Sequence, residues 1–406
     1  MGDALLRLGE NPEADDLVFQ QLNSYRSLFN KVMLPVNTAC RNQATRRLKA
    51  NEAKKVIVVQ RIKRLDSITA KLNRFPSMQL SQMQDIGGLR VILPSIGDVE
   101  IYTKNLLARS KKIKIKGMKN YIASPKEDGY RGIHYILELE NNATDVVPFP
   151  TLLVELQVRT QVQHIWATGV EIAAIINNKN YKTGDWDADW KESFILLSHL
   201  CALLETMDKN IDTFGVDFDN IKKSTEILLK KIDSFVTLAR KTNLAKKFNS
   251  FSKVLPLLVK EIKQKQFKHT ELLLLITDFE LNKTEVTAYT DEKLALDHLT
   301  VWEKRFSSSS KQTGQAVLVS AKDILNLKEA YPNYYMDTNP LQELWTDIQH
   351  KLSLYKQKVA LLLEQKTKEE QEKIFFYENQ IRINEGKLLV LKARKKQIQA
   401  KLKETE

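Results

Sequence analysis

The chain contains only two cysteines, Cys40 and Cys201, and they lie far apart in the sequence. Two distant cysteines make neither a disulfide framework nor a C-x-x-C metal pair, so we expect buried thiols in a reducing cytoplasm. Long apolar runs are also missing, and charged residues interrupt the first apolar residues too early for a signal peptide. The sequence therefore predicts a cytoplasmic protein without a membrane partner.

Positive charge exceeds negative charge, with 63 lysines and arginines against 50 aspartates and glutamates and a formal net charge of +13. This balance favours a polyanionic partner, either nucleotides or nucleic acid, but it does not determine the fold. Hydrophobic residues make up 43% of the 406 positions, which is enough for a sizeable core. The length predicts two or three domains.

Two apolar runs that carry acidic residues form the centre of the predicted site. Asp85 stands directly before an apolar run over residues 86–93, which we expect to enter the sheet as a strand. Residues 152–159 alternate, with aliphatic side chains on one face and Glu155, Gln157 and Arg159 on the other. Each of these two strands therefore offers one acidic side chain.

Apolar residues recur at roughly helical intervals over residues 14–73, with an interruption expected at Pro35 and a last helix over residues 56–72. In that last helix Lys63, Ser67 and Lys71 are four residues apart and would share one face. A solvated cationic stripe is the simpler interpretation of such a run. The alternative is a polyphosphate site, because polyphosphate is bound by several point charges.

A loop rich in proline and glycine precedes a predicted strand over residues 133–139. Within nine positions this segment carries five side chains that can hold a nucleotide, namely Lys126, Asp128, Tyr130, Arg131 and His134. A lone histidine beside a strand is usually structural, and a lone tyrosine is usually buried. Their clustering favours a binding site over these simpler interpretations.

Four motifs follow one another over residues 61–171. They are R-x-K-x3-S-x3-K-L from Arg61, D-I-x-G-L-R from Asp85, P-K-x-x-G-Y-R-x-I-H from Pro125 and E-L-Q-V-R-T-x3-H-x-W-A from Glu155. Together they resemble the synthetase domain of the RelA/SpoT-type alarmone synthetases. The resemblance implies an α/β (α+β) domain in which helices flank a mixed, nucleotidyltransferase-like sheet. It also implies a magnesium-dependent pyrophosphokinase that transfers the β,γ-pyrophosphate of ATP to the ribose 3′-hydroxyl of GDP or GTP, forming (p)ppGpp and AMP.

The resemblance assigns five residues to ATP. Arg61 and Arg90 would lie on opposite faces of the adenine, a role that suits planar guanidinium groups. The triphosphate would contact Lys63, Ser67 and Lys71.

The resemblance assigns the remaining roles to the metal and the acceptor. Asp85 would be a Mg²⁺ ligand, and Glu155 would be a second ligand or the base that takes the proton of the acceptor hydroxyl. Tyr130 would stack on the acceptor base. The acceptor phosphate and ribose would contact Lys126, Arg131, His134, Gln157 and Arg159.

Three positions depart from the family pattern: Asp128 replaces the usual Asn, Gly132 a common Ser, and Glu171 a common His. The negative charge of Asp128 should disfavour a highly charged free nucleotide. These departures resemble single-domain relatives, including toxic ones that pyrophosphorylate the 3′ end of tRNA and block translation. A toxin or phage-defence enzyme is therefore the alternative, and a degenerate nucleotide-binding regulator is a third hypothesis. The first of six histidines is His134, which argues against a metal-dependent hydrolase in this chain.

The rest of the chain is expected to support or regulate the site. A helical layer precedes a small α/β domain with its own sheet, which could bind a regulatory protein or another trigger. We interpret its tyrosine cluster over residues 331–335 as a packing corner, with a recognition patch as the alternative. The charged end predicts a long helix, either a coiled coil that could join subunits of a homo-oligomer or a single helix. The expected parts are 1–73 (N-terminal helices), 74–182 (synthetase core), 183–267 (helical layer), 268–350 (accessory domain) and 351–406 (long helix).

Overall fold

The computed structural model describes residues 2–7, 12–48, 56–104, 106, 113–140, 151–179, 181, 184–213, 218–252, 272–280, 283–307, 313–320, 324–335, 337–383, 395–400 and 402. The chain divides into two compact units. The first comprises Met1–Thr206 with Lys231–Leu344 and contains the sheet. The second comprises Met207–Lys230 with Trp345–Glu406, and its described part is helical.

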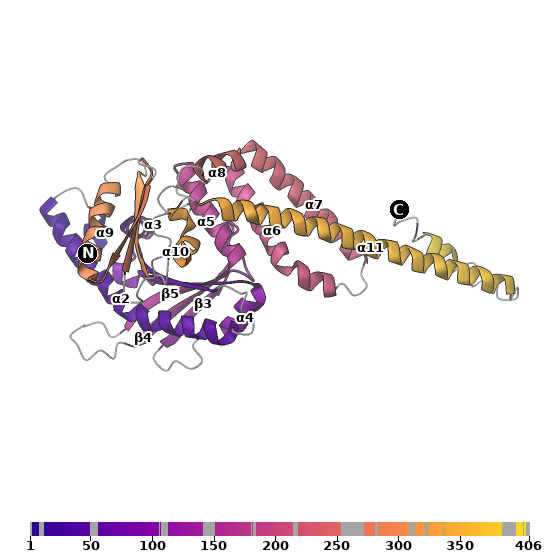
Figure 1. The fold of residues 1–406 in the computed structure, drawn as a ribbon, viewed down its shortest axis with the longest axis horizontal. Coiled ribbons are helices and arrows are strands. Elements are labelled where there is room, and N and C mark those ends of the chain that lie inside the picture. The colour runs from indigo at the N-terminus through magenta and orange to yellow at the C-terminus, as the bar shows by residue number, and fades with distance from the viewer. Residues whose placement is uncertain are drawn as a thin grey trace. The chain divides into compact units, whose positions relative to one another are not determined.

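The described residues form one eight-stranded mixed sheet with the strand order β3-β4-β5-β2-β1-β8-β6-β7 (Figure 1). Strands β2 and β5 are parallel, and the other neighbours are antiparallel. The strands are β1 (Ile57–Ile62), β2 (Gly87–Leu93), β3 (Ile113–Asn120), β4 (Ile133–Glu140), β5 (Thr151–Thr160), β6 (Leu272–Asp278), β7 (Lys283–Tyr289) and β8 (Gly314–Ser320). The mixed sheet with flanking helices confirms the predicted fold class.

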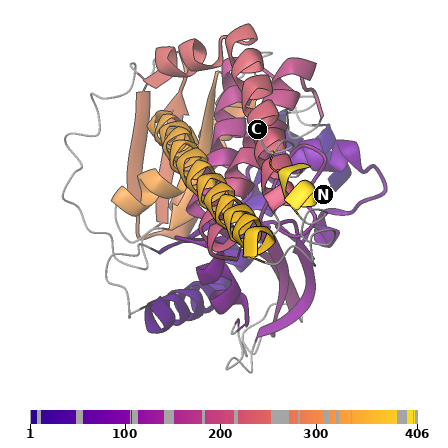
Figure 2. The same ribbon diagram turned by 90° about the vertical axis from the view of Figure 1, so that its right-hand side faces the viewer.

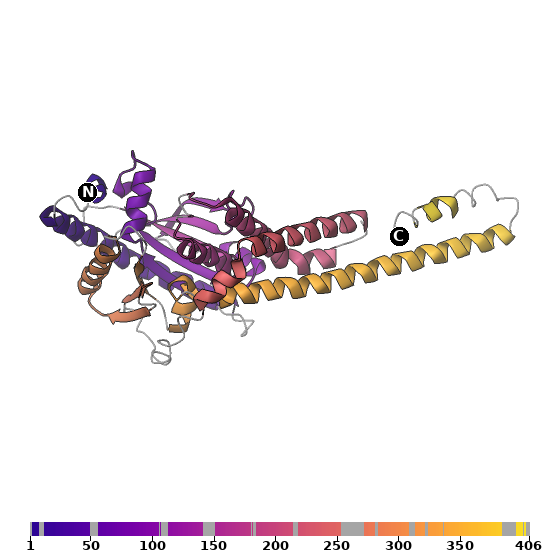
Figure 3. The same cartoon turned by 90° about the horizontal axis from the view of Figure 1, so that it is seen from above.

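Helices cover both faces of this sheet. Helices α2 (Pro12–Leu48), α4 (Ile96–Lys104) and α9 (Glu292–Ser307) pack on one face, and α9 lies beside α2 (Figures 1 and 3). Helices α5 (Gln161–Ile176), α10 (Ile324–Ala330) and η3 (Pro332–Tyr334) contact strands from the other face. The remaining elements are α1 (Gly2–Leu6), α3 (Leu65–Arg74), η1 (Leu80–Gln82), α6 (Ala188–Thr213), α7 (Phe218–Lys241), α8 (Leu244–Ser252) and α11 (Asn339–Ile383).

The alternation of side chains along the strands separates a core face from a site face. In β5, Val154, Leu156 and Val158 are buried in the core that α2 covers. Because successive side chains of a strand point to opposite faces, Glu155 and Gln157 lie on the side of α5 and α10. The predicted strands over residues 133–139 and 152–159 are confirmed by β4 and β5, as is the strand that follows Asp85.

Two local predictions in the N-terminal part are wrong. Residues 57–62 form the central strand β1 and not the start of a helix. This strand is buried on both faces, so Ile57, Val58 and Val59 follow one another without the alternation that marks a half-buried strand. Pro35 does not interrupt the first long helix, since α2 continues through it.

The accessory part does not have its own sheet, which corrects a further prediction. Strands β6, β7 and β8, drawn in orange in Figure 2, continue the sheet of the predicted synthetase core because β8 pairs with β1. The register places Gln60 opposite Ser320 and Arg61 opposite Val319. The division of the chain into five parts stays a prediction.

Several smaller expectations have clear outcomes. Cys40 and Cys201 are free and buried, as predicted. Among the described residues no helix combines the length and the apolar character needed to cross a bilayer. Helix α11 contains Ile374 and Ile381 of the proposed coiled-coil seam, whereas residues 388 and 391 lie outside the described residues. The coiled coil and the homo-oligomer therefore stay predictions.

Candidate active site

A cavity of about 790 Å³ lies on the α5 side of the sheet. Its walls come from β1, β2, β4 and β5, from helices α3 and α5, and from the loop before β4. Of the predicted site residues, only Arg131 does not line it. The others are Arg61, Lys63, Ser67, Lys71, Asp85, Arg90, Lys126, Tyr130, His134, Glu155, Gln157 and Arg159.

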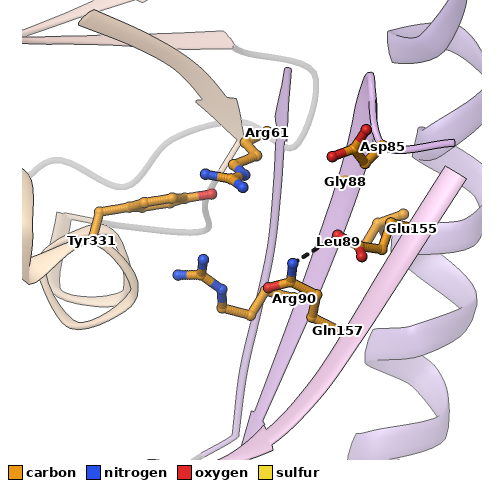
Figure 4. A pocket seen from close by; sticks show the side chains of 8 residues that line it. All are labelled: Arg61, Asp85, Gly88, Leu89, Arg90, Glu155, Gln157 and Tyr331. Carbon is orange, nitrogen blue, oxygen red and sulfur yellow. Dashed lines mark hydrogen bonds between the residues drawn. The ribbon is translucent and has the colours of Figure 1, made fainter. Parts of the chain in front are cut away.

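Strand register brings residues from distant motifs into neighbouring rows. Gly88 of β2 lies between Arg61 of β1 and Glu155 of β5, since it is the register partner of both. In the next row of this face, Gln157 is the partner of Arg90 and of His134. Figure 4 shows that the carboxylates beside β2 and the two arginines face a common space. The parallel pairing of β2 with β5 therefore assembles the acidic and basic groups of the site.

The space at the two arginines is nearly filled by Tyr331. Arg61, Arg90 and Tyr331 line a volume of about 10 Å³, which is roughly the space of one water molecule. The Arg90 guanidinium donates from Nη1 to the carbonyl of Ala330 at 3.0 Å and lies 5.7 Å from the centre of the Tyr331 ring (Figure 4). Both arginines also line the larger cavity, so Tyr331 restricts one side of the arginine pair.

Asp85 is held on both carboxylate oxygens by lysines. Lys63 Nζ lies 2.6 Å from Oδ2 and Lys71 Nζ lies 2.8 Å from Oδ1. Burial alone would raise the pKa of the Asp85 carboxyl, but the charge and hydrogen bonds of the two lysines outweigh burial and lower it. Burial also lowers the pKa of Lys63, and Asp85 offsets only part of that effect. Asp85, Lys63 and Lys71 thus form a compact charged cluster beside helix α3.

Helix α3 is fixed by two residues that sequence reasoning missed. Its first turn has no side-chain cap of its own, and the Leu65 amide instead donates to Glu303 Oε1 of α9 at 2.7 Å. Glu303 is paired with Arg26 of α2 at 2.8 Å, and Arg26 also donates to the Lys63 carbonyl at 3.0 Å. A carboxylate at a helix N-terminus is favourable because the exposed N–H groups carry partial positive charge. The accessory helix α9 thus positions the lysine-bearing helix.

Glu155 is also engaged on both oxygens. His134 Nδ1 lies 2.8 Å from Oε1, and Gln157 Nε2 donates to Oε2 at 2.7 Å. Burial would raise the pKa of the Glu155 carboxyl, but these hydrogen bonds and the nearby charge of Arg61 hold it well below its usual value. Burial lowers the pKa of His134, and the hydrogen bond and charge of Glu155 offset only part of that effect. The residues therefore favour an ionised glutamate beside a neutral imidazole.

The backbone before Tyr130 depends on one glycine. Gly129 has a φ of 90°, and a Cβ there would lie 3.1 Å from the Ser198 side chain and 3.2 Å from the Ile195 backbone. The Tyr130 amide donates to Asp128 Oδ1 at 3.0 Å, a turn that an asparagine could make equally well. The substitution of Asp for Asn in the motif thus changes the local charge and not the loop geometry.

Arg131 belongs to a buried structural network. Its Nη1 lies 2.6 Å from Glu205 Oε2, and both side chains are almost fully buried. Glu205 also contacts Thr160 and Gln163 at the start of α5. The sequence spacing does not indicate the pairing of Arg131 with Glu205, and the predicted contact of Arg131 with acceptor phosphate or ribose stays a prediction.

The fold and the cavity define an α/β protein with acidic and cationic side chains on one sheet face. Residues 60–184 match the family described as "Region found in RelA / SpoT proteins". GTP pyrophosphokinase YjbM of Bacillus subtilis (strain 168) is 34% identical over 133 residues, which are 31% of this chain and 56% of that protein. GTP pyrophosphokinase YwaC of the same organism is 33% identical over 113 residues, 27% of this chain and 52% of that protein.

The small alarmone synthetase 1 from Bacillus subtilis, in a crystal structure with its product pppGpp, has 25% sequence identity and a TM-score of 0.40. That match covers 48% of this chain and 97% of that chain. The chain spans about half the length of the curated relatives it matches. The chain thus carries a RelA/SpoT region, which confirms the resemblance predicted from the four motifs.

Proposed function

We propose that the chain is a magnesium-dependent pyrophosphokinase that transfers the β,γ-pyrophosphate of ATP to a ribose 3′-hydroxyl. The observation that carries this proposal is the convergence of Asp85, from the turn before β2, and Glu155, from β5, on one cavity that also contains two arginines and two lysines. The match to the RelA/SpoT region and the names of the relatives support it. GDP or GTP is the first acceptor proposed, which would make the product (p)ppGpp.

In the proposed complex ATP replaces contacts that the protein now makes with itself. The adenine enters between Arg61 and Arg90 once Tyr331 has moved away. The triphosphate takes Lys63 and Lys71 from Asp85, because a polyphosphate offers these ammonium groups more negative charge than one carboxylate does. Ser67, one turn before Lys71 in α3, adds a hydroxyl on the same wall of the cavity.

The donor set of the site fits magnesium. Asp85 and Glu155 line the same small space, and a carboxylate is the protein ligand that Mg²⁺ prefers. One or two carboxylates suffice, since waters and phosphate oxygens complete the shell. When bound, the ion would neutralise charge on the transferred phosphates.

The chemical step follows from the same residues. The acceptor 3′-oxygen forms a bond to the β-phosphorus of ATP, and the bond between that phosphorus and the oxygen bridging to the α-phosphate breaks. AMP leaves with the electron pair of the broken bond, and the proton of the acceptor hydroxyl passes to Glu155. Lys63, Lys71 and the arginines stabilise the charge on the phosphates, which is the main task of a protein in phosphoryl transfer.

A tRNA 3′ end is the second acceptor candidate, and a feature of the cavity rim favours it. Tyr181 and Trp186 stack with ring centres 4.0 Å apart at an interplanar angle of 7°, beside Lys179. Aromatic rings with neighbouring cations are typical of surfaces that bind single-stranded nucleic acid. An enzyme that modifies tRNA in this way would block translation, as a toxin or a phage-defence protein does.

Transfer of label from [γ-³²P]ATP distinguishes the acceptors. The purified chain is incubated with Mg²⁺ and with GDP, GTP or deacylated tRNA, and the products are separated by chromatography and gel electrophoresis. Label in a guanosine nucleotide supports the first candidate, and label at the tRNA 3′ end supports the second. Label in none of them, also with Tyr331→Ala, contradicts the proposed function and leaves a nucleotide-binding regulator.

A further inference from the structure

Five side chains of the site form a closed ring of hydrogen bonds. One arm runs from Arg159 Nε to the Tyr130 hydroxyl (3.0 Å), from that hydroxyl to His134 Nε2 (2.5 Å), and from His134 Nδ1 to Glu155 (2.8 Å). The other arm runs from Arg159 Nη2 to Gln157 Oε1 (2.7 Å) and from Gln157 Nε2 to Glu155 (2.7 Å). Both arms begin at the same guanidinium and end at the same carboxylate.

With a neutral His134, the chemistry of the two ends fixes the direction of every bond in the ring. A guanidinium only donates and an ionised carboxylate only accepts. The Tyr130 oxygen therefore accepts from Arg159 and donates its own proton to His134 Nε2. His134 must then carry its proton on Nδ1 and donate it to Glu155, since the hydrogen bond at one ring nitrogen sets the state of the other. Burial raises the pKa of the Tyr130 hydroxyl, so it keeps the proton that this arrangement needs.

Two cations lie close to the Tyr130 ring. Lys126 Nζ lies 4.9 Å from the ring centre, and the Arg159 guanidinium lies at the same distance of 4.9 Å. Tyr121, His134 and Trp166 meet the ring edge to face. These contacts and the ring of hydrogen bonds hold the Tyr130 side chain beside Glu155 in the cavity.

We propose that the Tyr130 hydroxyl and His134 are positioning residues for Glu155. They hold the carboxylate in one orientation. Each carboxylate oxygen accepts one hydrogen bond within the ring, so a further lone pair remains for the acceptor hydroxyl. This inference rests on the proposed function, in which Glu155 takes the acceptor proton. It assigns the hydroxyl of Tyr130 a task that the aromatic ring alone cannot perform.

Tyr130→Phe separates the two roles because it keeps the ring and removes the hydroxyl. Loss of an outer partner of a site residue typically lowers activity by about 10- to 100-fold. We therefore expect kcat for pyrophosphate transfer to fall by at least about tenfold while KM for the acceptor changes less than about twofold. The matched control is Tyr121→Phe, whose hydroxyl makes no hydrogen bond within the described part of the chain. It should behave like the unchanged protein.

The state of His134 gives a second readout that needs no activity. In ¹⁵N-histidine NMR spectra of the full chain, assigned with His134→Asn, we expect a neutral ring protonated on Nδ1. Tyr130→Phe should shift the Nε2 signal, and Tyr121→Phe should not. A ring protonated on Nε2, or an Nε2 signal unchanged by Tyr130→Phe, overturns the inference.

The outcomes separate this inference from the proposed function. An active protein whose kcat is unaffected by Tyr130→Phe overturns the positioning role alone. An unchanged kcat with a raised KM supports acceptor stacking and also overturns it. If no acceptor takes label, the proposed function fails, and the NMR experiment still shows whether the ring of hydrogen bonds exists.

Discussion

Removal of one lysine from Asp85 should strengthen metal binding in the absence of nucleotide. Lys71→Met keeps most of the side-chain stem but removes the ammonium that lies 2.8 Å from Oδ1. The freed oxygen can then bind a divalent cation, and a positive charge that would repel the cation is gone. The complex of metal with ATP should instead bind more weakly, because the triphosphate loses one of its two proposed lysine partners.

The size of the effect follows from the exposure of the pair. The Lys71 and Asp85 side chains are 28% and 22% exposed, which places them between a surface pair and a buried pair. Exposed pairs contribute up to about 1 kcal/mol. A slightly larger value of about 1.4 kcal/mol corresponds to a tenfold change in affinity. We therefore expect free Mn²⁺ to bind Lys71→Met about tenfold more tightly than the unchanged protein.

Electron paramagnetic resonance of free Mn²⁺ measures this affinity directly, without turnover. The control is Lys179→Met, which removes an ammonium on the cavity rim that is paired with Asp185 at 3.0 Å. It should leave the affinity for free Mn²⁺ unchanged. An unchanged or weaker Mn²⁺ affinity of Lys71→Met would refute the idea that the lysines compete with the metal for Asp85.

Three further predictions concern other parts of the site. Asp85→Asn and Glu155→Gln should each lower pyrophosphate transfer by at least about a hundredfold, since one preorganised electrostatic contact is worth roughly 3 kcal/mol; single-turnover rates check this. Tyr331→Ala should tighten binding of a fluorescent ATP analogue by opening the space at the arginines, and unchanged affinity would show that the tyrosine does not block it. Arg131→Met should lower the free energy of unfolding by about 3 kcal/mol, because it leaves Glu205 buried and unpaired, while ATP affinity stays unchanged. Denaturant unfolding and ligand titration of the same samples test both parts.

The strand that carries Glu155 was predictable because it is half buried. Residues 152–159 alternate between aliphatic and polar side chains, and this two-residue period can be read directly from the sequence. β1 was not predictable in the same way, since a central strand covered on both faces loses its alternation. The motif spacing still placed Arg61 at the site, although it lies on a strand and not on a helix.

Contacts between distant segments could not be predicted from the sequence. The packing-corner interpretation of residues 331–335 agrees with the buried state of Tyr331, Tyr334 and Tyr335. Nothing in their spacing indicates that Tyr331 reaches Arg90, because that contact depends on the pairing of β8 with β1. The same long-range pairing merges the accessory strands with the central sheet. The motif around Arg131 suggested a ligand contact, whereas in the structure Arg131 pairs with Glu205 of α6. This pairing also joins segments that are distant in the sequence.

The release of AMP is the most direct test of the central claim that Asp85 and Glu155 serve one pyrophosphate transfer. The Tyr331→Ala chain, in which the purine site should be open, is incubated with ATP, Mg²⁺ and each acceptor, and AMP and ADP are quantified by chromatography. We expect AMP in an amount equal to that of the pyrophosphorylated acceptor. Glu155→Gln as a second substitution in the same chain should abolish both products. ADP as the product, or AMP formation that persists without Glu155, would contradict the proposed role of these two acids.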